Sequence, residues 1–579
     1  MFAKGCLPRR KSSTLHDEWY AGPQFMILAG RHIPRNETLR CDICIVGSGA
    51  AGITAALELA QSSFDVILLE AGGFRSERAV QDLYRGEVDR PDRHSPLHLF
   101  RSHRVGGTTT LWYGKCLPFD AIDLQERSYV PYSGWPIRAA DLSTCYKRAH
   151  QYLDIGEDEY EVKNAIHGAS AEMIPGFRSD VVRTDTIARY SLPTNFATRY
   201  RTDLKAAKNI KHILRASCTK IALEPDGRTV SHIVVRCLDG NRFQVSARQF
   251  ILAAGGLEVT RLLLASNDVQ KREIGNHSGV LGRFYMCHLS GVVSVVSLAG
   301  RAEDAIYDFE RTRDGVYCRR QLWISESAQR KDEILNFGAW LHFPKIYDPS
   351  HGNGVLSAAF FAKPQLPEEY LAELAEDLAR NGWNYRLLAQ HARNMLVDAP
   401  TLLHFVLKWI YKRILSKRKI PQIVLKSPAN RYRLYYIAEQ APSPESRVYL
   451  SDETDTLGVP RLVVNWRTSE LDVRSALTAH GLVQRELKRS RCGHLAFKEG
   501  SIEDGIRGSV ATAGHHIGTT RMARDPRRGV VDENCRVHNV SNLYIASSSV
   551  FPTSGRANPT LTIVALAIRV ADRIKKLLK

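Results

Sequence analysis

The sequence has no internal repeat, no low-complexity tract and no clear linker, so we expect one interwoven body instead of a string of separate domains. It also lacks an apolar segment near its start. Residues 1–20 carry Arg9, Arg10 and Lys11, but residues 12–20 are polar where a secretory signal needs a hydrophobic region. We therefore expect no cleaved export signal and a cytoplasmic location.

Regularly spaced cysteines are missing too. The chain has eleven cysteines, an odd number without a repeating pattern, which favours reduced core thiols over a disulfide framework. Cys41 and Cys44 form a C-x-x-C pair, but no second pair completes a zinc site. His515 and His516 are adjacent and so are not at zinc-ligand spacing. We therefore expect no metal.

Acidic residues are outnumbered: 61 Asp plus Glu stand against 80 Lys plus Arg, a net charge of +19. Such a surface attracts anions of many kinds, yet no aromatic-basic module points to nucleic acid. The run Gly505-Ile506-Arg507-Gly508-Ser509 does not fit the G-x-S-x-G elbow of hydrolases. With 579 residues and 44% hydrophobic content, the chain can bury one large core or two domains.

A strand, a helix and a second strand surround a glycine-rich run near the start of the chain. Cys41 to Val46 reads as a short buried strand, Ile53 to Gln61 as a helix and Asp65 to Leu69 as the next strand. Gly47-Ser48-Gly49-Ala50-Ala51-Gly52 lies between the first strand and the helix. This order predicts a β-α-β unit that binds a dinucleotide.

Each glycine of the run has its own expected role. Gly47 permits a tight turn, Gly49 lets the backbone approach a pyrophosphate, and Gly52 lets helix and strand pack closely. The free N–H groups at the helix N-terminus favour phosphates. Glu70, at the end of the second strand, is placed to accept hydrogen bonds from ribose hydroxyls, which leaves FAD or NAD as the nucleotide.

A general base, an amide and a helix start occur together near the C-terminus. His515 and His516 are candidate bases, because imidazole suits proton transfer at neutral pH. Asn558 precedes Pro559, which opens a run of helix formers reaching about Ile574. Asn before Pro also favours a helix cap, and the helix would then aim its positive end at whatever lies in front of it.

With these two ends, the chain resembles the glucose-methanol-choline (GMC) family of FAD-dependent oxidoreductases. The C-terminal stretches that carry the likeness are His515-His516-Ile517-Gly518-Thr519 and Ser554-Gly555-Arg556-Ala557-Asn558-Pro559-Thr560. Internal stretches similar to the family are Arg104 to Trp112, the glycine-rich flavin loop, Phe250 to Gly256, a strand returning to the FAD domain, Gly282-Arg283 and Asn542 to Ala546. Val105 to Trp112 and Ser547 to Pro552 look most like the pyranose oxidase branch of bacterial sugar oxidoreductases.

The resemblance implies an α/β fold: a Rossmann-like FAD-binding domain interwoven with an α+β substrate domain on an antiparallel sheet. Residues 31–150, 210–289 and 500–579 would form the FAD-binding domain, and residues 151–209 and 290–499 the substrate domain. The alternation from Tyr432 to Gln440 fits a strand of that sheet, and Arg447 to Leu450 and Leu462 to Trp466 read as further strands.

The resemblance also implies the catalytic pair. His515, three residues before Gly518, falls on the family's catalytic histidine, and Asn558 falls on its partner. His515 would take the hydroxyl proton while Asn558 bonds the same oxygen. His516 remains the rival base, because the register of a short loop is easily shifted by one. His516 and Gln440 are also candidate substrate contacts.

FAD is the implied cofactor. Pyranose oxidases attach FAD covalently through a histidine where this chain has Leu111, so the FAD would be non-covalent here. Ser547 stands where many members of the family have aspartate. The expected cofactor-binding residues are Gly47, Gly49, Ala50, Ala51, Gly52, Glu70, Arg104, Gly106, Gly107, Thr108, Leu111, Trp112, Cys218, Ala254, Ser547, Asn558, Pro559 and Thr560.

The implied reaction is FAD-dependent oxidation of a secondary alcohol of a sugar, glycoside or glycosylated metabolite to the ketone, followed by reoxidation by oxygen or another acceptor. A non-sugar alcohol, or a non-redox lyase with structural FAD, is the alternative. A third, non-enzymatic alternative takes the positive charge as a nucleic-acid footprint. The sequence leaves the acceptor and the oligomeric state open.

Leu402 to Ile420 combines apolar residues with a run of lysines and arginines. It is too short and too charged to span a bilayer. A basic amphipathic helix of this kind can lie on an anionic membrane. The alternative is a domain helix with one buried face and a solvated basic rim.

Overall fold

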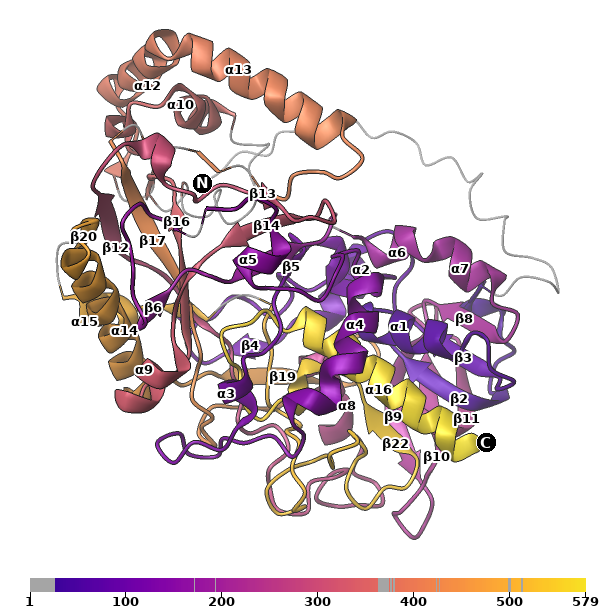
Figure 1. Ribbon diagram of the computed structural model, residues 1–579. Helices are drawn as coiled ribbons and strands as arrows, with labels where there is room; N and C mark the ends of the chain where they lie inside the picture. The colour runs from indigo at the N-terminus through magenta and orange to yellow at the C-terminus, as the bar shows by residue number, and fades with distance from the viewer. Residues whose placement is uncertain are drawn as a thin grey trace.

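The computed structural model describes residues 27–579 except 171, 193, 363–373, 375–376, 379–380, 423, 426, 428, 498–500 and 512–513. The expectation of no export signal in residues 1–20 lies outside the described residues. Two sheets organise the molecule (Figure 1). Residues of both sheets line the cavity described below.

The predicted β-α-β unit is confirmed as β2 (Thr38–Val46), α1 (Ala50–Leu59) and β3 (Val66–Leu69). The helix starts three residues earlier than the sequence predicts, because Gly49 already has the extended backbone of an N-cap residue. Gly47 has φ +101°, and a Cβ there would lie 2.7 Å from the Ala253 carbonyl oxygen. A Cβ on Gly52 would lie 1.8 Å from the Gly47 carbonyl oxygen, so both positions require glycine.

The nucleotide sheet has strand order β1-β8-β3-β2-β11-β10-β9, with β22 added beside β11. Its other strands are β1 (Ile27–Ala29), β8 (Ile210–Leu214), β9 (Ser217–Leu223), β10 (Val230–Arg236), β11 (Arg242–Leu252) and β22 (Leu543–Ile545). β2 pairs in parallel with both β3 and β11, so the carboxyl ends of all three strands meet at one edge. Ligands bind outside that edge in sheets of this type.

The second sheet has strand order β20-β12-β17-β16-β15-β6, with β21 beside β12, and all its pairs are antiparallel. Its strands are β6 (Val182–Arg183), β12 (Leu289–Leu298), β15 (Leu322–Ile324), β16 (Phe337–His342), β17 (Arg431–Ala438), β20 (Gly493–Phe497) and β21 (Val510–Ala511). β17 confirms the strand predicted over residues 432–440, two residues shorter at its end.

Two small sheets complete the strands. One has the order β13-β14-β7-β5: β13 (Glu310–Arg311), β14 (Tyr317–Arg320), β7 (Ile187–Tyr190) and β5 (Lys115–Cys116). The other joins β18 (Arg447–Thr454), β19 (Pro460–Asn465) and β4 (Glu87–Val88). The predicted strands at 447–450 and 462–466 therefore exist, but they form a sheet apart from β17.

The longer helices cover the sheets or project from them (Figure 1). They are α4 (Ser143–Tyr152), α8 (Gly256–Leu264), α10 (Gly354–Phe361), α12 (Tyr385–Val397), α13 (Ala399–Trp409), α14 (Glu470–Arg489) and α16 (Thr560–Leu578). Shorter helices are α2 (Arg78–Gln81), α3 (Ala121–Leu124), α5 (Val162–Ala165), α6 (Phe196–Arg199), α7 (Arg201–Ala206), α9 (Glu326–Lys331) and α15 (Ile502–Arg507). α16 packs against α1 and α4.

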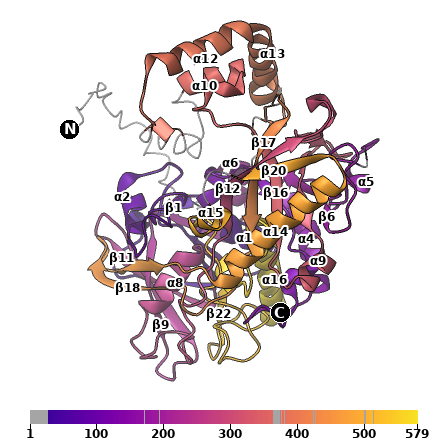
Figure 2. The same cartoon turned by 90° about the vertical axis from the view of Figure 1, so that its left-hand side faces the viewer.

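The helices α10, α12 and α13 project at one end of the molecule, beyond the second sheet (Figures 1 and 2). They share a small core of their own around Phe343, Leu356, Phe360 and Leu387. A π-helical turn, Ile410–Leu415, extends α13. No helix among the described residues is long and apolar enough to cross a membrane.

The proposed segment boundaries at 150, 209, 289 and 499 stay a prediction. The short strand β5, in the first expected FAD segment, pairs with β7 of the first expected substrate segment. β21, in the last expected FAD segment, pairs with β12 of the antiparallel sheet.

Candidate active site

A cavity of about 760 Å³ runs from the carboxyl ends of β2 and β3 to the antiparallel sheet. Gly49, Glu70 and Cys218 line the nucleotide end, and His515, Asn558 and Trp340 line the other. The glycine run and the C-terminal motif, more than 400 residues apart in sequence, thus face one space. A single elongated ligand can occupy both ends.

Two helices begin at this cavity without a side-chain cap. Gly49 precedes α1 and Pro559 precedes α16, and neither supplies a capping hydrogen bond. The first N–H groups of a helix need acceptors, and here a ligand can provide them. The cap expected from Asn558 is not observed, because its side chain turns to His515 instead. These free N–H groups fit the phosphates and the ring of FAD.

Glu70 is held beside the glycine run. Its carboxylate accepts hydrogen bonds from the Ser48 N–H at 2.9 Å, the Ser48 hydroxyl at 2.8 Å and the Gly72 N–H at 3.0 Å. A carboxylate has about four acceptor positions. Glu70 therefore also braces the loop, and it retains capacity for a ribose hydroxyl in the cavity that it lines.

Most predicted cofactor-binding residues line the cavity. They are Gly47, Gly49, Ala50, Ala51, Glu70, Gly107, Thr108, Leu111, Trp112, Cys218, Ala254, Ser547, Asn558, Pro559 and Thr560. Among described residues, three predicted positions are absent from that lining: Gly52, Arg104 and Gly106. Gly52 packs helix against strand, the Arg104 Nε donates to the Thr110 hydroxyl at 3.1 Å, and Gly106 has φ +85°. These three residues lie outside the cavity lining and support the segments that form it.

His515 is held between His288 and Asn558. The Nδ1 atoms of His515 and His288 lie 2.9 Å apart, and the His515 Nε2 lies 3.2 Å from the Asn558 Nδ2. The His288 Nε2 lies 3.3 Å from the Ser554 carbonyl oxygen, which can only accept a hydrogen bond. His288 therefore donates there and accepts from the His515 Nδ1–H. This leaves the His515 Nε2 with its lone pair toward Asn558.

Burial keeps both histidines neutral. Desolvation lowers the pKa of His515 well below its usual 6.5, and the neighbouring His288 and Lys115 side chains lower it further. Burial likewise lowers the pKa of His288 to about 4. A neutral His515 with a free Nε2 can accept a proton over the whole neutral pH range.

His516 belongs to a different hydrogen-bond cluster, built around the phenol of Tyr285. The Tyr285 hydroxyl lies 2.6 Å from the His516 Nδ1, 2.8 Å from the His94 Nε2 and 3.4 Å from the Cys287 Sγ. The His94 Nδ1 lies 2.7 Å from the Ser95 carbonyl oxygen, so it carries the proton and the Nε2 accepts from Tyr285. Tyr285 in turn accepts from the His516 Nδ1–H.

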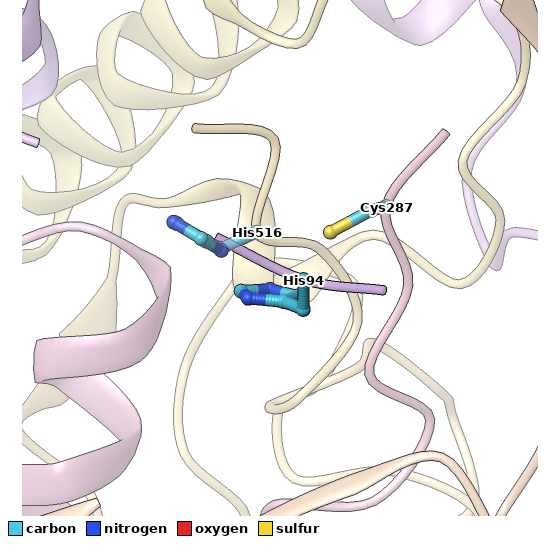
Figure 3. Close-up of side chains that lie close together, drawn as sticks. All are labelled: His94, Cys287 and His516. Atoms are coloured by element: carbon cyan, nitrogen blue, oxygen red, sulfur yellow. The ribbon is translucent and has the colours of Figure 1, made fainter. Parts of the chain in front are cut away.

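Figure 3 shows His94, Cys287 and His516 close together, on three separate segments of the chain. Their ligand atoms lie within 4.8 Å of one another, as in a metal site. However, all three contact the same tyrosine hydroxyl. Burial also raises the pKa of the Cys287 thiol to about 12, which disfavours the thiolate that a metal needs. We interpret the cluster as a hydrogen-bonded support for the His516 ring.

The far wall of the cavity comes from the antiparallel sheet and β5. Trp340 and Tyr435 pair across β16 and β17, and their rings lie 5.0 Å apart. Lys115 pairs with Tyr190 across β5 and β7, and its Nζ lies 3.8 Å from the centre of the Trp340 ring. All four side chains line the cavity.

Gln440 is placed differently from the expectation. It is fully buried. Its Oε1 accepts from the Cys287 N–H at 2.9 Å and the Trp466 Nε1–H at 2.8 Å, and its Nε2 donates to the Arg467 carbonyl at 2.6 Å. Gln440 is not part of the cavity lining. The reason is that β17 ends at Ala438, so Gln440 lies beyond the strand whose side chains reach the cavity.

Sequence reasoning missed His288, Tyr285 and Lys115. Tyr285 and His288 follow the recognised Gly282-Arg283 pair closely, and Lys115 follows the recognised loop by three residues. Extending these motifs would have flagged the positions. The sequence around Trp340 did not indicate a role in the site, because local sequence does not show which face of a strand lines a cavity.

Comparison with known proteins agrees with this geometry. A family described as GMC oxidoreductase matches residues 442–567, and a family described as FAD binding domain matches residues 42–80. The chain is 23% identical to the 6'''-hydroxyparomomycin C oxidase of Streptomyces lividus and 24% identical to the paromamine 6'-oxidase of Streptomyces fradiae. Each match covers 92% of this chain and 91% of the relative.

Two further comparisons cover different shares of this chain. The fructose dehydrogenase large subunit of Gluconobacter japonicus is 25% identical over 62% of this chain and 53% of its own. A solved formate oxidase structure shares the fold with a TM-score of 0.50 and 17% identity, covering 94% of this chain and 99% of its own. The two matched families lie at the glycine run and around His515 and Asn558. Residues 442–567 thus match the GMC oxidoreductase family, and the chain is an FAD-dependent oxidoreductase that acts on CH–OH groups.

Proposed function

We propose that this enzyme oxidises a secondary alcohol of a sugar, a glycoside or a glycosylated metabolite to the ketone, with oxygen or another acceptor taking the electrons afterwards. The observation that carries the proposal is the pair formed by the His515 Nε2 and the Asn558 Nδ2, 3.2 Å apart at the cavity wall. An alcohol oxygen that lies beside both nitrogens can donate its proton to the His515 Nε2 and accept from the Asn558 N–H.

His515 performs the proton step. As the hydroxyl proton moves to its Nε2, the substrate oxygen becomes more negative, and the Asn558 N–H stabilises that charge. FAD supplies the acceptor for the hydride that leaves the same carbon. The His288 Nδ1 holds the His515 ring throughout, so the Nε2 keeps its direction while it takes the proton.

The sugar part of the proposal rests on two supports. The relatives named above include a fructose dehydrogenase large subunit and two oxidases of similar overall length. The far wall presents Trp340, Tyr435 and Tyr190, and aromatic rings of this kind pack well against the apolar faces of sugar rings.

Anaerobic mixing tests the function. The purified yellow protein is mixed without oxygen with free sugars, glycosides and simple alcohols, and the flavin absorbance is followed. Bleaching by a sugar or glycoside supports the proposal. Bleaching by simple alcohols alone indicates a non-sugar substrate, and no bleaching by any alcohol favours a lyase with structural FAD.

We also propose that the chain contacts a membrane surface through Leu402 to Ile420. Within the described residues, twelve of the 22 exposed large hydrophobic side chains lie between residues 383 and 415. They are Trp383, Tyr385, Leu396, Val397, Leu403, Val406, Leu407, Trp409, Ile410, Tyr411, Ile414 and Leu415. Only Leu402 and Phe405 of α13 pack partly against the small core, so the buried-face alternative accounts for little of this helix.

The charge of this segment indicates which kind of membrane surface it contacts. Residues 383–420 contain eight Lys or Arg, at 386, 393, 408, 412, 413, 417, 418 and 419, against the single acid Asp398. That excess repels a second copy of this chain and favours an anionic bilayer. The segment continues into Gln422, which lines the cavity, so bound lipid would lie near that part of the cavity.

Vesicle sedimentation tests the contact. We expect the holoenzyme to sediment with vesicles containing phosphatidylglycerol but not with pure phosphatidylcholine. The double variant Lys408→Glu, Lys412→Glu should lose this binding, whereas Lys208→Glu, Lys211→Glu, on another surface, should keep it. Equal partitioning of all three proteins contradicts the contact.

For the location itself, ten free cysteines among the described residues support a reducing compartment such as the cytoplasm.

A further inference from the structure

The substrate end of the cavity holds a positive charge without a matching negative one. Lys115 stands at the start of β5 and lines the cavity. Its Nζ contacts the face of Trp340 at 3.8 Å. Among the described residues we find neither a carboxylate nor a hydrogen-bond acceptor at this ammonium group.

The charged groups that face Lys115 from neighbouring elements are all cations. They are Arg556, which follows the C-terminal motif, and Arg319 of β14. Arg556 is already bound to Asp120, with the Nε at 2.8 Å from its carboxylate, and Arg319 donates to the carbonyls of Tyr307 and Leu341. Neither provides Lys115 with a counter-charge.

The carboxylates that line the cavity lie elsewhere and are occupied. Glu70 is bound by the glycine loop. Glu258 pairs with Arg101 at 3.1 Å and with Arg261, and Asp455 pairs with Arg261 at 2.7 Å. The substrate end therefore has an ammonium group for which the described part of the chain supplies no counter-ion.

Burying an unpaired ammonium group costs free energy, and the burial lowers the pKa of Lys115 to about 7, with Arg556 and Arg319 lowering it further. The charge of Lys115 also lowers the pKa of both His515 and His288, so it acts at the catalytic pair. Lys115, His515 and Asn558 line the same cavity, so one ligand can contact all three.

We propose that Lys115, resting on Trp340, binds an anionic group of the substrate, so that the enzyme prefers sugars or glycosides that carry a carboxylate or a phosphate. This rests on the proposed oxidation of a sugar alcohol. Trp340 and Tyr435 would pack against the ring while the ammonium group pairs with the anion. When the anion binds, it supplies the missing counter-charge and favours the protonated amine.

The oxidation arm of the test uses holoenzyme and matched pairs of alcohols. Methyl glucoside is compared with methyl glucuronide, and glucose with glucose 6-phosphate, by anaerobic flavin reduction at pH 6 and pH 8.5. We expect wild type to reduce its flavin with the anionic member at a tenfold lower substrate concentration at pH 6. This preference should shrink at pH 8.5, because Lys115 is then mostly neutral.

Two variants of Lys115 distinguish the effect of its charge on the preference from the effect of its side-chain shape. Lys115→Met should reduce the preference for the anion at least tenfold, whereas Lys115→Arg should keep it at both pH values. Lys205→Met, on an exposed helix, is the control and should behave as wild type. A preference that survives in Lys115→Met, or an equal loss for neutral and anionic sugars, overturns the proposal.

The binding arm does not depend on oxidation. Resting holoenzyme is titrated with glucuronate and with inorganic phosphate while the flavin absorption spectrum is followed. Lys115-dependent binding of either anion supports the subsite, and the stronger one identifies the group. If no sugar bleaches the flavin, the proposed function fails; if neither anion binds, or if Lys115→Met binds both as wild type does, the subsite fails. A resting spectrum altered by Lys115→Met would assign the charge to the flavin and also overturn the subsite.

Discussion

The His288 Nδ1 accepts the hydrogen bond of the His515 Nδ1–H across 2.9 Å, and this contact decides which nitrogen of His515 faces the substrate. Because the His288 Nε2 donates to the Ser554 carbonyl, the tautomer of the pair is fixed by an atom that can only accept. The proposed base is thus held by a residue 227 positions away along the chain.

Replacing His288 should disturb the direction of His515 without removing it. We expect His288→Leu to lower the rate of flavin reduction by about 10²-fold, the typical cost of a misplaced catalytic group. His288→Gln keeps an acceptor for the His515 Nδ1–H and should recover part of that rate. Stopped-flow reduction measures both, and equal rates in the two variants would reduce His288 to a packing residue.

Asn558→Ala removes the N–H that faces the His515 Nε2. Because this donor stabilises the developing charge on the substrate oxygen, we expect the limiting reduction rate to fall by about 10²-fold. FAD content should stay near one per chain, since Asn558 does not cap α16. The measurement is the reduction rate at saturating substrate; a change in substrate affinity alone would contradict this role.

The pH dependence of reduction should reveal the link between Lys115 and His515. Burial lowers the pKa of His515 well below 6.5 and the Lys115 charge lowers it further, so the loss of rate in acid should occur well below pH 6.5 in wild type. Removing that charge in Lys115→Met lets the pKa of His515 rise, and the acid limb should move to higher pH. Reduction rates with a neutral sugar from pH 4.5 to 9 test this shift; identical acid limbs would deny the interaction.

Gln440→Leu should destabilise the fold and spare the chemistry. The variant leaves the buried Cys287 N–H and Trp466 Nε1–H without an acceptor, which costs roughly 2–4 kcal/mol in total. We expect thermal unfolding several degrees lower than in the exposed control Gln151→Leu. Substrate affinity should match wild type in both, and a selective loss of affinity would restore Gln440 as a substrate contact.

The sequence foretold the parts of the site whose chemistry is local. Gly47, Gly49 and Glu70 could be read from one β-α-β pattern because turn geometry and helix ends depend on neighbouring residues. His515 and Asn558 followed from the spacing of a family motif. The antiparallel strand β17 was also found from alternation alone.

Other features of the site could not be predicted, because they depend on which strands and side chains from distant parts of the chain lie together. Lys115 meets Trp340 because β5 joins β7 beside the antiparallel sheet, and no local pattern encodes that register. Gln440 was misplaced because alternation does not tell where a strand stops facing the cavity. Asn558 was expected to favour a cap on α16, but Pro559 stands at the N-cap position and the Asn558 Nδ2 contacts the His515 Nε2.

The central claim is that His515 is the base, and one comparison tests it most directly. His515→Ala and His516→Ala are purified with FAD bound, and anaerobic flavin reduction is measured with the best sugar substrate. We predict that His515→Ala loses at least about 10²-fold in rate, while His516→Ala, which loses a bond to Tyr285, loses far less. Near-normal reduction by His515→Ala, or a larger loss in His516→Ala, would contradict the assignment.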